Sequence, residues 1–160
     1  MSKVFLIAGL GADTRVYKNI DLSDHEVVSV DWIEPDKTDT LTTYAQKLIL
    51  QYSITPNSII IGNSLGGMIG IEMAKLIPLE KVIQISSIKT VDEAPWYFPL
   101  FRWLPIYKII PGTWYKHLSF FVKFVFGKMN PDDAWLFMDM LKKSSPLFLK
   151  WAMEAGPALG

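Results

Sequence analysis

The sequence contains no cysteine and only two histidines among its 160 residues. Without cysteine, the protein cannot form disulfides, use a thiol nucleophile or hold a metal through thiolates. The two histidines, His25 and His117, restrict the choice of a general base, because histidine takes that role most often. The histidines and carboxylates also show no metal-ligand spacing such as H-x-x-x-H, so we expect neither a metal nor a cofactor.

The sequence also lacks an excess of either charge, since sixteen basic residues balance sixteen acidic ones. This balance indicates no nucleic-acid partner, because nucleic-acid binding needs a basic surface. No uncharged apolar run reaches the roughly 18 residues of a membrane span. The apolar residues after Lys3 continue into a Gly/Asp turn, which favours a first strand over a secretion signal. The default localisation is therefore cytoplasmic.

Half of the residues are hydrophobic and a fifth are charged, which is typical of one globular domain. Residues 42–52 and 64–77 have helical patterns, and Thr40 is a suitable N-cap for the first. Strands and helices alternate, so we predict an α/β fold with a parallel sheet. Three of the four strand-like runs are nearly continuous apolar stretches, as in strands covered on both faces. The four runs are Val4–Ala8, Glu26–Asp31, Ser58–Ile61 and Lys81–Ser86, the second being the less apolar one.

The character of the sequence changes at Ala94. Residues 94–130 contain twelve of the twenty-one aromatic residues, five basic residues and no acid. Prolines divide this stretch into short segments that we expect to be helical, and prolines also open two further predicted helices, Pro131–Lys142 and Pro146–Ala155. We therefore divide the chain into a core, residues 1–93, and a helical lid segment with a ragged C-terminus, residues 94–160.

The aromatic residues of the lid segment allow three interpretations. Ordinary packing over the core is the first, because large apolar residues most often serve it. A cavity for a hydrophobic or acyl substrate is the second. Aromatic residues among cations could also form a membrane-binding surface, which is the least favoured of the three.

The most informative motif is Gly62-Asn63-Ser64-Leu65-Gly66-Gly67, which fits G-x-S-x-G. A predicted strand precedes it and a predicted helix follows it. A serine on such a tight strand-to-helix turn presents its hydroxyl at the end of a sheet, and small neighbours permit the bend. This context favours Ser64 as a nucleophile over the alternative of a structural turn.

A second glycine-rich turn, Gly9-Leu10-Gly11-Ala12-Asp13, follows the first predicted strand. It is not a dinucleotide-binding fingerprint, because Thr14 stands where the third glycine would be. Its amides could bind an anion at the same end of the sheet as Ser64. We predict an oxyanion hole formed by the backbone amides of Leu10 and Leu65, although a plain tight turn is the alternative.

Together these two motifs resemble the α/β-hydrolase superfamily, and in particular its small serine esterases and lipase-like members. The resemblance implies that Ser64 is the nucleophile and that the amides of Leu10 and Leu65 bind the oxyanion. Many members have His-Gly where this chain has Ala8-Gly9, so the sequence departs from the commonest pattern there. The resemblance also implies a helical lid after the fourth strand, and an incomplete, C-terminally truncated α/β-hydrolase fold.

The resemblance further requires an acid and then a histidine after the serine. His25 precedes the second strand, so we expect it at the opposite end of the sheet, and His117 lies in the lid segment. Asp92 and Glu93 follow the last strand at the correct end, but solvated loop carboxylates are the simpler interpretation. The 160-residue chain alone is therefore expected to be inactive.

Two hypotheses follow. The first is a serine hydrolase that acts on a carboxylic ester or related acyl substrate through Ser64, with the acid and histidine elsewhere. The second is a non-catalytic module that binds a hydrophobic ligand or a partner. In either case an apolar strand edge at Lys81–Ser86 predicts self-association.

Overall fold

The computed structural model describes residues 2–88 and 130–155. Four parallel strands form one sheet in the order β2-β1-β3-β4. Val4 of β1 is paired with Val27 of β2, and Asn63 of β3 is paired with Ile85 of β4. The predicted strands and the parallel sheet are confirmed, with bounds that differ from the sequence expectation by one or two residues. The strands are β1 (Lys3–Ile7), β2 (Glu26–Val30), β3 (Ile59–Asn63) and β4 (Lys81–Ile85).

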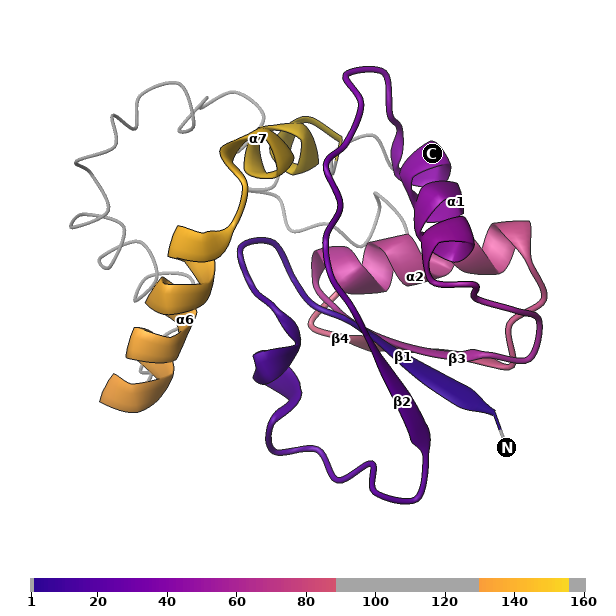
Figure 1. The fold of residues 1–160 in the computed structure, drawn as a ribbon, viewed down its shortest axis with the longest axis horizontal. Coiled ribbons are helices and arrows are strands. Elements are labelled where there is room, and N and C mark those ends of the chain that lie inside the picture. The colour runs from indigo at the N-terminus through magenta and orange to yellow at the C-terminus, as the bar shows by residue number, and fades with distance from the viewer. Residues whose placement is uncertain (1, 89–129, 156–160) are drawn as a thin grey trace.

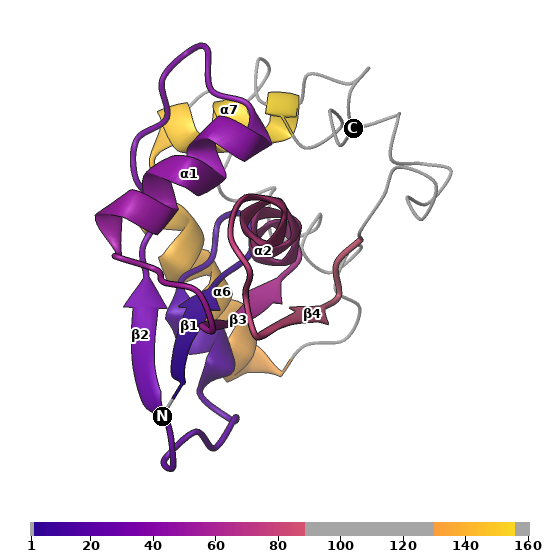
Figure 2. The same ribbon diagram turned by 90° about the vertical axis from the view of Figure 1, so that its right-hand side faces the viewer.

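Two helices cover one face of this sheet (Figures 1 and 2). Helix α1 (Leu41–Gln51) begins at the predicted cap, Thr40, and buries an apolar stripe. Helix α2 (Leu65–Leu76) lies against α1 and the sheet and is buried on most of its surface. The buried carboxylate of Glu72 in α2 accepts hydrogen bonds from Thr42 Oγ1 at 2.6 Å and from Lys75 Nζ at 2.7 Å.

A short 3-10 helix, η1 (Thr14–Tyr17), connects β1 towards β2 and was not predicted. Asp13 caps it, and the buried Tyr17 packs on the sheet beside Val4, Leu6 and Ile61. Tyr17 Oη donates a hydrogen bond of 2.6 Å to the carbonyl of Ile7, and burial raises the pKa of this phenol to about 12. The sequence did not reveal this helix, because glycine and aspartate before it indicate a loop and a single helical turn is too short to show helical periodicity.

Helices α6 (Pro131–Lys143) and α7 (Pro146–Ala155) lie at the carboxyl ends of the strands (Figure 1). Both were predicted, and α6 is one residue longer than expected. Phe148 and Trp151 of α7 belong to the same hydrophobic cluster as Phe5 and Tyr44, and Trp151 Nε1 donates to the carbonyl of Asp39 at 2.8 Å. These helices therefore complete the core. The aromatic-rich predicted segments of residues 94–129 lie outside the described residues.

Strand β4 is an edge of the described sheet, and Ile83 is 40% exposed. The expectation that this strand is covered on both faces is therefore not met among the described residues. Strand β4 pairs only with β3 among the described residues, so its other edge has no strand partner there. Within residues 2–88 and 130–155, no helix combines the length and the hydrophobicity required to cross a membrane.

Candidate active site

The strand order places a topological switch point between β1 and β3. The chain leaves β1 for β2 on one side, whereas it leaves β3 for β4 on the other. Connections that diverge in this way open a crevice at the carboxyl ends of the two strands, where ligands bind in open α/β sheets. Both predicted motifs meet at this switch point, because the Gly9–Asp13 loop follows β1 and Ser64 follows β3.

Ser64 occupies a strained position between β3 and α2. Its backbone has φ 49° and ψ −115°, a conformation that an L-residue seldom adopts and that costs about 1–3 kcal/mol. The residue is exposed, and its hydroxyl makes no capping hydrogen bond to α2. The strain therefore places an available hydroxyl at the N-terminus of a helix, where partial positive charge favours a developing anion.

Close backbone contacts make this turn possible. A Cβ on Gly62 would lie 2.4 Å from the carbonyl carbon of Gly66, and a Cβ on Gly66 would lie 2.1 Å from the carbonyl oxygen of Ile7. The Ser64 amide donates to the carbonyl of Ile85 at 2.9 Å, and the Ser64 carbonyl accepts from Ser87 Oγ at 2.7 Å. Strands on both sides of β3 thus hold the turn, and Ser87 was not predicted to take part.

The Gly9–Asp13 loop lies directly beside Ser64. A Cβ on Gly9 would be 3.4 Å from Ser64 Cβ and 2.8 Å from Asn63 Oδ1. The Leu10 amide donates to no acceptor among the described residues. The Leu65 amide is in the first turn of α2, where an amide has no acceptor in its own helix. The structure therefore brings together Ser64 and the backbone of the two residues proposed to bind an oxyanion.

Of the two histidines, His25 is the one in the part of the chain that the structure describes, and it does not join this group. His25 is exposed and immediately precedes β2, so it lies at the opposite end of the parallel sheet from Ser64, as expected. His117, Asp92 and Glu93 lie outside the described residues. The described ranges also contain no group of three or more histidine, aspartate or glutamate side chains that could hold a metal ion.

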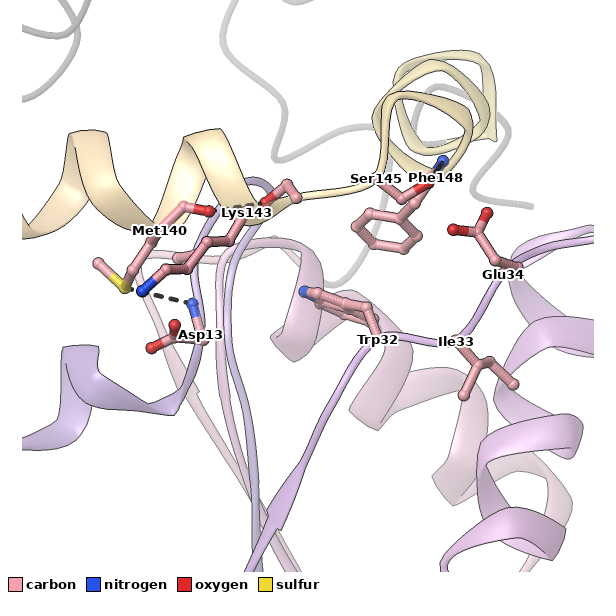
Figure 3. A pocket seen from close by; sticks show the side chains of 10 residues that line it. Asp13, Trp32, Ile33, Glu34, Met140, Lys143, Ser145 and Phe148 are labelled. Atoms are coloured by element: carbon pink, nitrogen blue, oxygen red, sulfur yellow. Dashed lines mark hydrogen bonds between the residues drawn. The ribbon is translucent and has the colours of Figure 1, made fainter.

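A cavity of about 340 Å³ is lined by Ala12 and Asp13 of the Gly9–Asp13 loop together with residues of α6, α7 and the segment after β2 (Figure 3). Trp32 and Phe148 stack in its wall with ring centroids 4.7 Å apart, and Trp32 Nε1 donates a long hydrogen bond of 3.4 Å to the carbonyl of Gly9. Met140 and Lys143 of α6 complete the wall opposite. Sequence reasoning missed these residues because they come from three segments that only the fold brings together.

Comparison with solved structures supports this description. The structure is similar to an esterase from Exiguobacterium antarcticum (TM-score 0.71, 18% identity), covering 98% of this chain and 66% of the esterase. It is also similar to a thermophilic esterase from Thermogutta terrifontis (TM-score 0.70, 16% identity), covering 98% of this chain and 64% of that one. A carboxylesterase from Nitrososphaera gargenis is similar as well (TM-score 0.77, 16% identity), with 99% of this chain and 65% of that one covered.

The protein has an α/β-hydrolase fold. No protein-family model and no curated protein matches the sequence. The matched region covers 64–66% of the residues of the three esterase structures named above, so this chain spans slightly less than two thirds of their length. At identities of 16–18% the similarity concerns the fold, so the chemistry must be argued from the residues themselves.

Proposed function

We propose that the protein is a serine hydrolase that acts on a carboxylic ester or a related acyl substrate, with Ser64 as its nucleophile. One observation carries the proposal: Ser64 is an exposed residue with a strained backbone and a hydroxyl that caps no helix, at the switch point of the sheet. Strain of this kind persists only when the surrounding structure enforces it, and it is concentrated at functional sites. The similarity to esterase structures supports the same class of reaction.

The proposed reaction begins when Ser64 Oγ attacks the carbonyl carbon of the substrate and transfers its proton to a general base. The carbonyl oxygen becomes an oxyanion that accepts hydrogen bonds from the amides of Leu10 and Leu65. Each such donor is worth about 3–4 kcal/mol in the transition state. The intermediate collapses to an acyl-serine and releases the alcohol, which takes the proton. Water then cleaves the acyl-serine and restores the hydroxyl of Ser64.

The general base belongs outside residues 2–88 and 130–155 in this proposal. Within those ranges His25 is the one histidine, and it lies at the wrong end of the sheet. A small hydrophobic or acyl substrate fits the surroundings best, because the stacked Trp32 and Phe148 adjoin the Gly9–Asp13 loop.

The test uses the protein at the length found in its source cells, incubated with short-chain p-nitrophenyl esters and with a fluorophosphonate probe. We expect turnover, and labelling of the peptide that contains Ser64. Ser64→Ala should lower kcat by about 1000-fold or more, as removal of a serine nucleophile does. Ser29→Ala is the matched control, because Ser29 is an exposed serine on β2. An active protein that keeps its rate after Ser64→Ala would contradict the proposal.

The alternative is a non-catalytic module that binds a hydrophobic ligand. The exposed position of His25, far from Ser64, is the observation that favours it. In that case the same esters would bind without turnover and without labelling, and the fluorescence of Trp32 beside the cavity would change on binding.

A further inference from the structure

The Gly9–Asp13 loop is tied to helix α6 by charged groups. The guanidinium of Arg15 binds Asp13 through Nε and Nη2 at 2.7–3.0 Å, and its Nη1 binds Asp139 of α6 at 2.8 Å. The Arg15 hydrogen bonds hold the pKa of Asp13 below its usual value, so this carboxylate is ionised at neutral pH. One side chain therefore joins the end of the loop to a helix more than a hundred residues further along the chain.

The loop also contacts α6 through one hydrogen bond to a sulfur atom and through apolar packing. The Asp13 amide donates to Met140 Sδ at 3.3 Å (Figure 3), and Met140 packs on Ala8 and Ala12. Gly11 has φ 71°, and a Cβ there would lie 2.6 Å from Leu141 Cδ1. Helix α6 thus covers the loop from one side while Trp32 reaches Gly9 from another.

The amide of Leu10 lies within this held segment, between Gly9 and Gly11. A donor in an oxyanion hole acts only when it is already oriented towards the developing charge. A small misplacement of such a group is expensive, since about 1 Å can cost 100-fold in rate. The loop contains two glycines, so its own backbone preferences do not fix that orientation.

We propose that Arg15 is a positioning residue, which fixes the Leu10 amide by joining the Gly9–Asp13 loop to α6 through Asp13 and Asp139. This inference rests on the proposed function, because it assigns Arg15 to the oxyanion hole of the same site. Arg15 does not touch the substrate in this scheme and acts through the loop.

The structure offers a matched control. Lys18, just after η1, binds Asp133 of α6 at 2.6 Å, so a second ion pair joins the same two parts of the chain. The side chains of Lys18 and Asp133 are 46% and 37% exposed, and those of Arg15 and Asp139 are 39% and 23% exposed, so the two ion pairs have similar exposure. The difference is that only Arg15 also binds Asp13 at the end of the loop. Loss of Lys18 therefore removes an ion pair to α6 and leaves the loop anchored.

The experiment measures kcat and KM of the full protein for a p-nitrophenyl ester. We expect Arg15→Ala to lower kcat by about 10- to 100-fold, below the 100- to 1000-fold of a lost oxyanion donor, with KM changed less than about 3-fold. Arg15→Lys should recover part of kcat, because an ammonium keeps the charge but lacks the rigid planar fork with which the guanidinium holds Asp13 through two nitrogens. Lys18→Ala should leave both constants within about 2-fold. Equal losses in Arg15→Ala and Lys18→Ala, or a change confined to KM, would overturn the inference.

A second readout does not depend on turnover. In ¹H–¹⁵N spectra, Arg15→Ala should shift and broaden the amide signals of residues 9–13, whereas Lys18→Ala should leave them unchanged. Unchanged signals in Arg15→Ala would overturn the inference even in an active enzyme. A wild-type protein without Ser64-dependent turnover would instead overturn the proposed function, and the spectra would still decide whether Arg15 holds the loop.

Discussion

The two helices that cover the sheet begin in opposite ways. Helix α1 follows Thr40, whose extended backbone lets its hydroxyl accept from the Thr43 amide, while Thr43 Oγ1 accepts from the Thr40 amide at 2.9 Å. Helix α2 follows Ser64, whose φ of 49° and ψ of −115° leave its hydroxyl without a capping bond. The hydroxyl of Thr40 thus caps and stabilises α1, whereas Ser64 is exposed and does not cap α2. The strained backbone and the uncapped helix end thus occur at the residue that we propose as the nucleophile.

The two helices also differ in how closely they approach the sheet. Helix α1 buries one stripe, whereas the first turn of α2 packs glycine backbone directly on the ends of β1 and β3. Sequence composition reflects this difference, because α1 is amphipathic and α2 begins Leu65-Gly66-Gly67. Three sets of substitutions test how these features of the two helices affect stability, and they are given in order of decreasing expected effect.

The largest effect is expected from Gly66→Ala. Its Cβ would lie 2.1 Å from the Ile7 carbonyl oxygen, and backbone cannot give way as a side chain can. We expect a loss of about 3 kcal/mol or more in the free energy of unfolding, the upper end of overpacking penalties. Gly70→Ala in the same helix is the control, since its Cβ would meet Val82 and Ile60 side chains at 3.0–3.1 Å. The helix propensity of alanine, favourable by about 1 kcal/mol, should offset that crowding. Urea denaturation measures both, and equal losses would show that the backbone contact is not decisive.

A smaller effect should separate the two helix starts. Thr40→Ala removes a capping box and should cost about 1 kcal/mol of stability. Ser64→Ala removes no capping bond and keeps the strained backbone, so stability should change by less than about 0.5 kcal/mol. Thermal unfolding of the two variants makes the comparison. A loss in Ser64→Ala as large as that in Thr40→Ala would mean that the Ser64 hydroxyl has a structural partner.

The smallest effect concerns pH at the start of α1. Burial alone would raise the pKa of Asp39, but hydrogen bonds from Lys47, the Asp36 amide and Thr43 outweigh it and hold this pKa below 3.8. A depressed folded-state pKa gives stability that is present above the unfolded-state pKa and is lost as pH falls through the folded value. The stability difference between wild type and Asp39→Asn should therefore shrink between pH 6 and pH 3. A constant difference over that range in urea titrations would contradict this role of Asp39.

Local patterns were sufficient for much of the fold. Continuous apolar runs identified β1 and β3, and helical spacing together with Thr40 located α1. The G-x-S-x-G motif identified the turn that carries Ser64, because the close backbone contacts of this turn leave no room for a Cβ at its glycines. Segment η1 escaped prediction because one helical turn has no period. Ser87, Trp32 and Arg15 escaped because each acts through a contact with a distant segment, which leaves no signature in its own neighbourhood.

Local sequence patterns predicted the four strands, the helices α1, α2, α6 and α7, and the tight turn at Ser64, since these follow from periodicity, capping and the sterics of glycine. Only the tertiary structure showed how closely the two predicted turns approach each other and which distant residues hold them. The order β2-β1-β3-β4 placed the Gly9–Asp13 loop against Ser64, and the packing of α6 placed Asp139 within reach of Arg15. Such contacts join residues far apart in the chain, so their energies depend on the whole packed arrangement and are absent from any local pattern.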